Sequence, residues 1–381
     1  KEMRFKLIII ILFLASQMMA ASNYGLISSV FEVSAVNMGM GGSPISAATY
    51  WQISALGAYS NPAFSSQHEG LSYSVSTLNF LEHDSGEENE TLEHDSKLLR
   101  IGYRGFGLLL SLDPLNGDAY ATETDYGEFV LYDTAGNPLG LFYPRERSGL
   151  IGCSIDVNEF AGNFGADGDI LPLKMDLALG LNHMNYISQL GWEGHEVKAK
   201  SNNLGILAKV PVFQDETWGW EAAAGASLFN AFDQSKPYTN SDGSARIYKR
   251  LNTSFSLGGS YKNKGFGGSQ FQQILPNIAT FRIVAGLTED FADDPLILSC
   301  GMECGLFDVI YGRGGYYHDS SGEIEGFTGG LGVNMHYGNV VGIRGDVALF
   351  PTGYLAKEKS IIEIGAYLDL FGVLDLMSIR R

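Results

Sequence analysis

Residues 327–337 read Phe-Thr-Gly-Gly-Leu-Gly-Val-Asn-Met-His-Tyr, and this stretch indicates the fold. Every second residue from Phe327 to Tyr337 is apolar or glycine, while the residues between them are small or polar. A period of two is that of a strand whose two faces meet different surroundings. One face of this strand therefore needs an apolar cover.

The same alternation recurs along most of the chain from residue 71, for example in residues 173–182 and 251–261. A soluble sandwich of two sheets could cover such faces, but its strands are short, with turns every 8 to 12 residues. Segments of about ten residues match the 9 to 11 that a tilted transmembrane strand needs. We therefore favour lipid as the cover.

We expect an all-β fold, a transmembrane antiparallel β-barrel of about 14 strands with an N-terminal lumenal plug, because an even number of strands closes without an edge. The strands are expected to begin near Leu71, Leu98, Gly107, Ser148, Leu173, Leu204, Trp218, Leu251, Ala279, Leu296, Asp308, Gly326, Val340 and Ile361.

Links between these strands alternate in length. They are short at residues 105–106, 215–216 and 338–339, and long and acidic at residues 82–96 and 113–146, with exceptions after Val157 and Lys262. Outer-membrane barrels have short periplasmic turns and longer external loops. The long acidic links are therefore expected outside the cell.

The register follows from the cost of charge in lipid, about 2 to 4 kcal/mol for Lys or Arg at mid-membrane. Lys174 and Arg344 must then face the lumen, together with Asp176 and Asp346, and Arg344 could pair with Asp346. In this register the three cysteines fall on the outer face, as small apolar residues: Cys153, Cys300 and Cys304.

The N-terminus resembles a signal peptide, with Lys1, Arg4 and Lys6 before an apolar run from residue 7 to 14 and the small residues 20–22. We expect residues 1–21 to be removed. The remaining 22 basic and 42 acidic residues give a formal charge of −20. Such an acidic protein repels phosphate backbones, so we expect no nucleic-acid partner.

Residues 22–68 lack sustained alternation and form an expected plug, because the lumen of a barrel of this size exceeds what wall side chains fill. Two motifs stand out: Ser34-Ala35-Val36-Asn37-Met38-Gly39-Met40-Gly41-Gly42-Ser43 and Tyr59-Ser60-Asn61-Pro62-Ala63. Consecutive glycines permit φ > 0, and Asn-Pro starts a turn. No Gly-Lys-Ser/Thr ending accompanies the glycines, so we expect no nucleotide or other cofactor.

These motifs resemble the FadL-like superfamily, in particular PorV/PorQ-type outer-membrane proteins. The plug motif of that resemblance comprises Met38, Gly39, Met40, Gly41, Gly42, Asn61, Pro62 and Ala63, although Phe64-Ser65 replaces the usual Gly-Leu. The resemblance implies a barrel over residues 69–371 in the bacterial outer membrane. It leaves residues 372–381 as a tail after the last strand.

The resemblance implies two alternative functions. One is to hold or shuttle exported cargo in type IX-like secretion, with secreted proteins or secretion-machinery subunits as partners. The other is FadL-like transport of an apolar ligand, with the plug as gate and lumenal aromatics such as Phe229 and Tyr367 at the site, unless these only pack the plug. No nucleophile and base stand together, so we expect no enzyme.

One polar cluster remains, the repeated Glu-His-Asp-Ser at residues 82–85 and 93–96, expected in a single external loop. Carboxylates beside imidazoles suit Ca²⁺ or Zn²⁺, but the spacing matches no standard metal loop and charge runs are usually solvated. We therefore expect no metal site.

Overall fold

The computed structural model describes residues 32–42, 54–80, 92–111, 120–132, 137–163, 175–189, 197–232, 236–237, 244–245, 249–264, 275–290, 296–320, 325–337, 340–351, 359–369 and 372–373. The expected signal peptide, Lys174 and most of the tail lie outside these ranges. Among the described residues, no helix is long and apolar enough to cross a membrane.

The described strands are β1 (Gly70–Phe80), β2 (Leu92–Tyr103), β3 (Phe106–Leu110), β4 (Thr122–Asp125), β5 (Phe129–Tyr132), β6 (Pro138–Phe142), β7 (Arg145–Asp156), β8 (Asp176–Gln189), β9 (Val197–Gln214), β10 (Trp218–Phe229), β11 (Lys236–Pro237), β12 (Ser244–Ala245), β13 (Arg250–Lys262), β14 (Asn277–Asp290), β15 (Leu296–Leu306), β16 (Ile310–Asp319), β17 (Glu325–Tyr337), β18 (Val341–Phe350) and β19 (Lys359–Leu368). The described helices are α2 (Ala35–Gly39), α3 (Gly57–Ser60), the 3₁₀ helix η2 (Pro62–Ser66) and α4 (Val157–Asn163).

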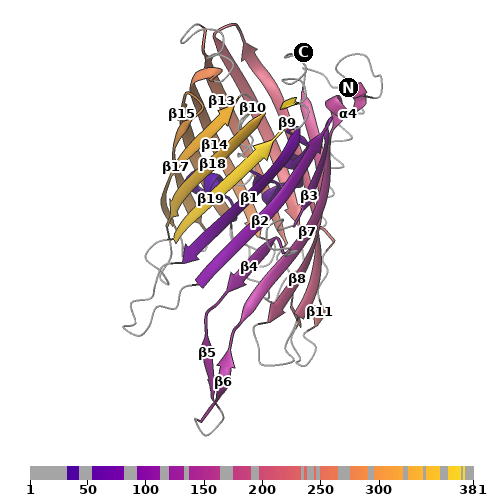
Figure 1. Cartoon of the computed structure of the whole chain (residues 1–381), viewed down its shortest axis with the longest axis vertical. Coiled ribbons are helices and arrows are strands. Elements are labelled where there is room, and N and C mark those ends of the chain that lie inside the picture. Colours follow the sequence, from indigo (N-terminus) through magenta and orange to yellow (C-terminus); the bar gives the residue numbers. More distant parts are fainter. Residues whose placement is uncertain are drawn as a thin grey trace.

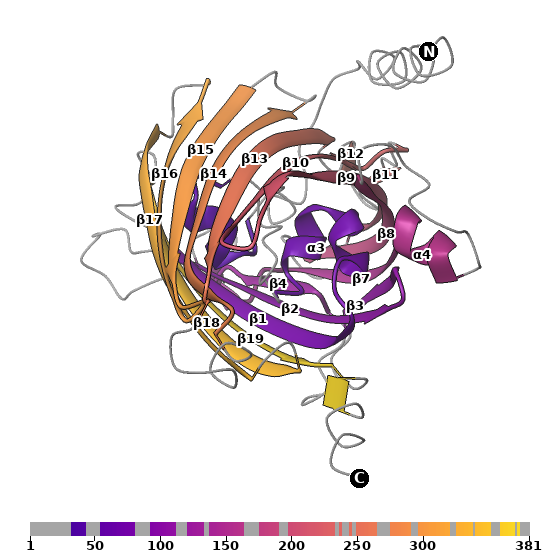
Figure 2. The same cartoon turned by 90° about the horizontal axis from the view of Figure 1, so that it is seen from above.

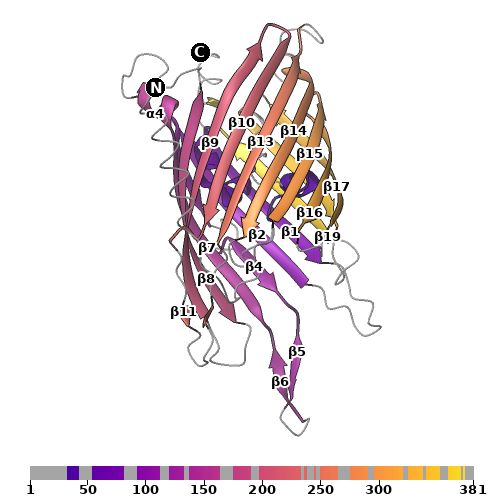
Figure 3. The same ribbon diagram turned by 180° about the vertical axis from the view of Figure 1, so that it is seen from behind.

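A closed antiparallel barrel forms because β1 pairs with both β2 and β19. Fifteen described strands share this sheet, and β3 and β4 together occupy one position between β2 and β7, so the wall has fourteen positions. Figures 1 and 3 show the tilted strands from opposite sides. The expected antiparallel barrel of about 14 strands is confirmed.

Both faces of the wall follow the alternation of the sequence. In β17 and β18 the apolar residues Leu331, Val333, Ile343 and Val347 point outward and are exposed, as lipid-facing side chains are. At the end with the short turns, aromatic residues face outward, and the rings of Trp218 and Tyr261 lie 4.9 Å apart. Aromatic residues favour the membrane–water boundary. The barrel therefore spans a bacterial outer membrane.

We name the short-turn end periplasmic, because short turns face the periplasm in such barrels. The turn between β2 and β3 and that between β17 and β18 lie there, and so does the start of β1 at Gly70. At the opposite end, the hairpin of β5 and β6 projects beyond the wall (Figures 1 and 3).

Strands reach further than the expected boundaries at this outer end. The second Glu-His-Asp-Ser, residues 93–96, belongs to β2 and not to a loop, which corrects our prediction. His94 is buried, and its Nδ1 lies 2.7 Å from Thr124 Oγ1. Residues 93–96 show no alternation of apolar and polar residues, because they pair in the barrel wall without an apolar outer face. His83 lies outside the described residues.

Candidate functional site

The N-terminal segment, whose described parts are residues 32–42 and 54–69, lies inside the barrel (Figure 2). Its first part packs through α2 against β16 to β19, and its second part packs through η2 against β2, β3 and β7 to β9. The segment thus contacts opposite walls. All eight residues of the expected plug motif belong to it: Met38, Gly39, Met40, Gly41, Gly42, Asn61, Pro62 and Ala63.

Glycines of the motif allow the first part to lie flat on the wall. Gly41 and Gly42 have φ of +83° and +72°, values that side chains of L-residues disfavour. Thr328 Oγ1 accepts from Gly41 N at 2.9 Å and donates to Gly39 O at 3.0 Å. A Cβ at Gly301 would collide with the Met40 backbone, so glycine is required on the wall as well.

Asn61 organises the second part. Its side chain caps η2 by accepting from Ala63 N at 3.1 Å and donates through Nδ2 to Ile206 O at 3.2 Å. Pro62 begins the helix, where its missing N–H leaves no bond unmade. The Asn-Pro step therefore ties η2 to β9.

Glu363 of β19 joins both parts of the segment to the wall. Its carboxylate accepts from Ser34 Oγ at 3.1 Å, from Ala35 N at 2.9 Å and from Ser54 Oγ. Sequence reasoning missed this residue, although an acidic residue on the inner face of the last strand was the available signal. Each charged hydrogen bond of this kind contributes about 1.5 to 3 kcal/mol.

A row of buried charges, the charge row, continues from Glu363 around the inner wall. Glu303 accepts from Arg313 Nε at 2.7 Å, Arg313 Nη1 lies 2.7 Å from Asp346 Oδ1, and Arg344 pairs with Asp346. Arg282 is the cross-strand neighbour of Glu303. The members of the charge row are Arg282, Glu303, Arg313, Arg344, Asp346 and Glu363. Arg344 and Asp346, which we expected in the lumen, lie within it.

The other wall carries a buried apolar cluster on its inside, among buried polar residues such as Ser96, Glu146 and Asn182. The N-terminal segment packs on β2, β3 and β7 to β10 in a buried cluster, which we call the apolar seam. Phe229 belongs to it and so packs near the segment, whereas Tyr367 lies beside Gly342. The members of the apolar seam are Val33, Ala55, Leu56, Ala58, Tyr59, Ala63, Phe64, Leu98, Leu109, Ala121, Leu150, Ala178, Met184, Tyr186, Ala199, Leu207, Ala223 and Phe229.

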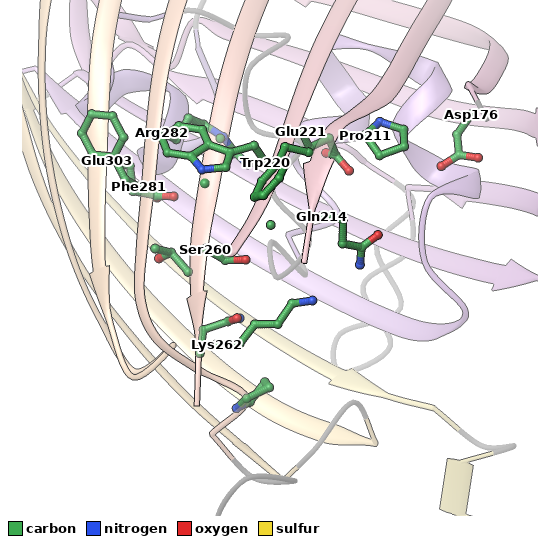
Figure 4. Close-up of a pocket in the computed structure, with 17 residues that line it drawn as sticks. Asp176, Pro211, Gln214, Trp220, Glu221, Ser260, Lys262, Phe281, Arg282 and Glu303 are labelled. Carbon is green, nitrogen blue, oxygen red and sulfur yellow. The ribbon is translucent and has the colours of Figure 1, made fainter. Parts of the chain in front are cut away.

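A cavity of about 480 Å³, the periplasmic cavity, lies at the periplasmic ends of β8 to β15 (Figure 4). Charged residues of both signs line it: Asp176, Glu221, Lys262, Arg282 and Glu303. Asp176, which we expected on the lumenal face, is exposed at the start of β8 and lines this cavity. Phe213, Trp220 and Phe281 also border the cavity, in the outward register of their strands.

A buried carboxylate lies beside this cavity in the turn between β15 and β16. Asp308 accepts from the backbone N and the Nδ2 of Asn277, at 3.1 and 2.9 Å. Burial raises the pKa of Asp308 to about 6.

The closed barrel, its apolar exterior and the segment inside its lumen place this protein in the class of outer-membrane β-barrels. No family model and no curated protein matches this sequence. The Pseudomonas putida toluene transporter TodX is similar in structure, with a TM-score of 0.44 and 11% identity over 93% of this chain and 100% of that one. The Ralstonia pickettii toluene transporter TbuX is similar too, with a TM-score of 0.42 and 9% identity over 89% of this chain and 99% of that one.

A FadL homologue of Pseudomonas aeruginosa gives a TM-score of 0.41 and 9% identity over 89% of this chain and 99% of that one. A FadL homologue is thus among the structures similar to this chain, and the PorV/PorQ part of the expected resemblance is not shown. We assign the fold from the strand pairing of this chain itself.

Proposed function

We propose that this protein admits small apolar molecules across the outer membrane, with the N-terminal segment as its gate. The observation that carries the proposal is the apolar seam on the inner wall, which the N-terminal segment covers. No step of this role requires catalysis.

Strand pairing defines where β4 takes over from β3 at the third wall position. On one side Leu110 of β3 pairs with Leu99 of β2, and on the other Thr122 of β4 pairs with Ser96. Residues 97 and 98 of β2 lie between these two pairs, and hydrogen bonds continue across them: Lys97 N donates to Ala121 O at 2.8 Å, and Ser111 N donates to Leu150 O of β7 at 2.8 Å. The described part of the wall therefore stays closed where β4 takes over from β3.

Four members of the apolar seam surround this place. Leu98, Leu109, Ala121 and Leu150 come from β2, β3, the residue before β4, and β7, and all are buried toward the inside. Burial favours an apolar molecule by about 0.8 kcal/mol per methylene group over exposure to water. An apolar molecule that reaches this part of the lumen therefore meets an apolar surface.

The N-terminal segment covers the same seam with Tyr59 and Phe64. Its polar attachments, such as Asn182 Nδ2 to Ala58 O at 3.1 Å, are hydrogen bonds that water can replace. Displacement of the segment would open the lumen without breaking the wall. This is the gating step that we propose.

The test is uptake of labelled toluene by cells whose outer membrane otherwise excludes it. Expression of the protein should raise the initial rate at least fivefold over cells without it. Leu150→Asn, which places a polar amide at the seam, should abolish most of the gain. Leu78→Asn, an equally buried leucine in a separate cluster, is the matched control. Equal uptake with and without the protein would refute the proposal.

A second candidate, holding secreted cargo in type IX-like secretion, is favoured by the hairpin of β5 and β6. Val130, Leu139 and Leu141 are exposed there, outside the barrel wall. Exposed apolar residues that gather beyond the lipid suit a protein contact. Leu139→Ser with Leu141→Ser should then lower the amount of secreted protein retained on the cell surface, and unchanged retention would argue against this role.

A further inference from the structure

The outer face of β8 and β9 changes from apolar to polar at one level of the barrel. Leu181 of β8 pairs with Leu204 of β9, and both side chains are exposed on the lipid side. The next outward pair toward the outer end is His183 and Asn202, whose Nδ1 and Oδ1 atoms lie 3.0 Å apart. The apolar surface of these strands therefore ends between the two pairs, which marks the outer boundary of the hydrocarbon layer.

Two lysines continue the outer face of β9 beyond this boundary. Lys198 and Lys200 are exposed, whereas Ala199 and Ser201 are buried toward the lumen. Residues two apart share a face of a strand, so both lysines lie in line with Leu204. We call Lys198 and Lys200 the lysine pair.

The lysine pair lies at the height of the lipid headgroups. Lys200 is four residues from Leu204 along β9. This separation is about 13 Å along a strand, and about 10 Å along the membrane normal for a tilt of about 40°. The headgroup layer extends about 5 to 8 Å beyond the hydrocarbon core on each side. A lysine lays its methylene groups on apolar surface while its ammonium group stays in the polar layer, so Lys200 reaches the lipid phosphates.

The surface around the lysine pair is basic, although the chain as a whole carries a formal charge of −18. In the described strands β8 and β9, the outer halves contain no acidic residue. The acidic residues of β4 contact β7 instead: Glu123 lies 2.7 Å from Arg147, and Asp125 lies 3.4 Å from Arg145. These arginines stand between the carboxylates of β4 and the lysine pair. An anionic group at the lysine pair is therefore attracted.

We propose that the outer face of β8 and β9 binds a phosphorylated glycolipid of the outer leaflet, with a phosphate at the lysine pair. Lysine ammonium groups bind phosphates as point charges. The exposed Asn185, which pairs with Lys200, offers an amide to a sugar hydroxyl. Leu181 and Leu204 lie directly below, where the acyl chains of such a lipid begin. A soluble phosphate has no use for this apolar surface. The site lies outside the wall, so this inference is independent of the proposed function.

The experiment is native mass spectrometry of the full-length protein, released from detergent micelles that contain either lipid A or digalactosyldiacylglycerol. Both lipids carry a disaccharide head, but only lipid A carries phosphate. We expect lipid A to be retained at least fivefold more than the uncharged lipid. Lys198→Gln with Lys200→Gln should lower the retention of lipid A about tenfold, because each lysine near an anionic lipid contributes to binding. Lys198→Arg with Lys200→Arg keeps both charges and should retain at least half.

The matched control is Lys262→Gln with Lys264→Gln, which removes two positive charges at the periplasmic end of β13 and should leave retention unchanged. Equal retention of the two lipids by the unaltered protein would overturn the inference. Equal losses in the two glutamine variants would overturn it as well, since binding would then follow net charge and not the lysine pair. Lipid A that excess inorganic phosphate displaces completely would show a phosphate site without a lipid, which also contradicts the proposal.

Discussion

Arg313 Nη1 lies 2.7 Å from Asp346 Oδ1 although β17 separates their strands. The pair crosses the inner face of β17 over Gly332, where a Cβ would overlap the Asp346 carboxylate and crowd the Arg313 guanidinium. Glycine at this position is therefore required by an ion pair between its neighbours, not by its own backbone angles.

Gly332→Ala should force these charges apart. Separating a buried pair leaves two charges partly unpaired, so we expect the free energy of unfolding to fall by about 3 kcal/mol. Urea unfolding in lipid vesicles measures it. Gly329→Ala on the same strand is the control, because its Cβ meets nothing within 4 Å and should change stability by less than about 1 kcal/mol. Equal effects of the two variants would contradict the crossing pair.

Glu363→Gln should loosen the N-terminal segment without unfolding the barrel. The amide nitrogen of Gln cannot accept from Ser34 Oγ or Ala35 N, so about 1 to 3 kcal/mol of attachment is lost. A cysteine placed at Ser34 should then react faster with a small thiol reagent, by tenfold or more. Glu325→Gln, at the exposed end of β17, should leave the rate unchanged. An unchanged rate in the Glu363 variant would remove this residue as an anchor.

Gly180→Ala should displace η2. Its Cβ would collide with the backbone of Pro62 and Ala63, and backbone cannot rotate away as a side chain can. We expect protease cleavage within residues 54–69 to accelerate at least fivefold. Gly345→Ala, where the added Cβ has open space, is the matched control. Equal cleavage in both variants would show that η2 is not held by β8.

Asp308 makes stability depend on pH. Because its pKa rises from 3.8 to about 6 on folding, the folded protein binds this proton more tightly than the unfolded chain. Stability should therefore fall as pH rises from about 4 to 6, by up to about 3 kcal/mol at 1.36 kcal/mol per pKa unit. Urea unfolding across this range gives the slope.

Asp308→Asn should remove that slope while keeping an oxygen acceptor for Asn277. Asp215→Asn is the contrasting variant, because hydrogen bonds from Trp218 N and Thr217 N lower the pKa of Asp215. Its contribution is lost only as pH falls below about 4, so it should not affect the range from 4 to 6. A slope that persists in the Asp308 variant would assign it to another group.

The sequence predicts the membrane-spanning part of this fold well, because lipid on one side and lumen on the other impose a two-residue period. That period also places Arg344 and Asp346 inside. Where strands continue beyond the lipid, the period fades. Residues 92–97 of β2 and residues 197–203 of β9 lack an apolar face, so β2 and β9 begin six or seven residues before the expected positions.

The contacts of the N-terminal segment cannot be predicted from this two-residue period. Glu363 and Ser34 are 329 residues apart, and nothing local in either sequence specifies their hydrogen bond. The motif glycines and Asn61-Pro62 indicate a segment rich in turns. The wall that each motif contacts depends on the register of strands far along the chain. The periplasmic cavity likewise collects residues from β8 to β15, which no single stretch reveals.

The bond between Glu363 and Ser34 also constrains the order of assembly. Glu363 belongs to the strand that closes the barrel against β1, and the segment that it holds precedes β1. Because Glu363 lies on that strand, this attachment can form only after the last strand is in place. Attachment of the N-terminal segment is therefore a late event, which links residues nearly the whole chain apart and is slow for that reason.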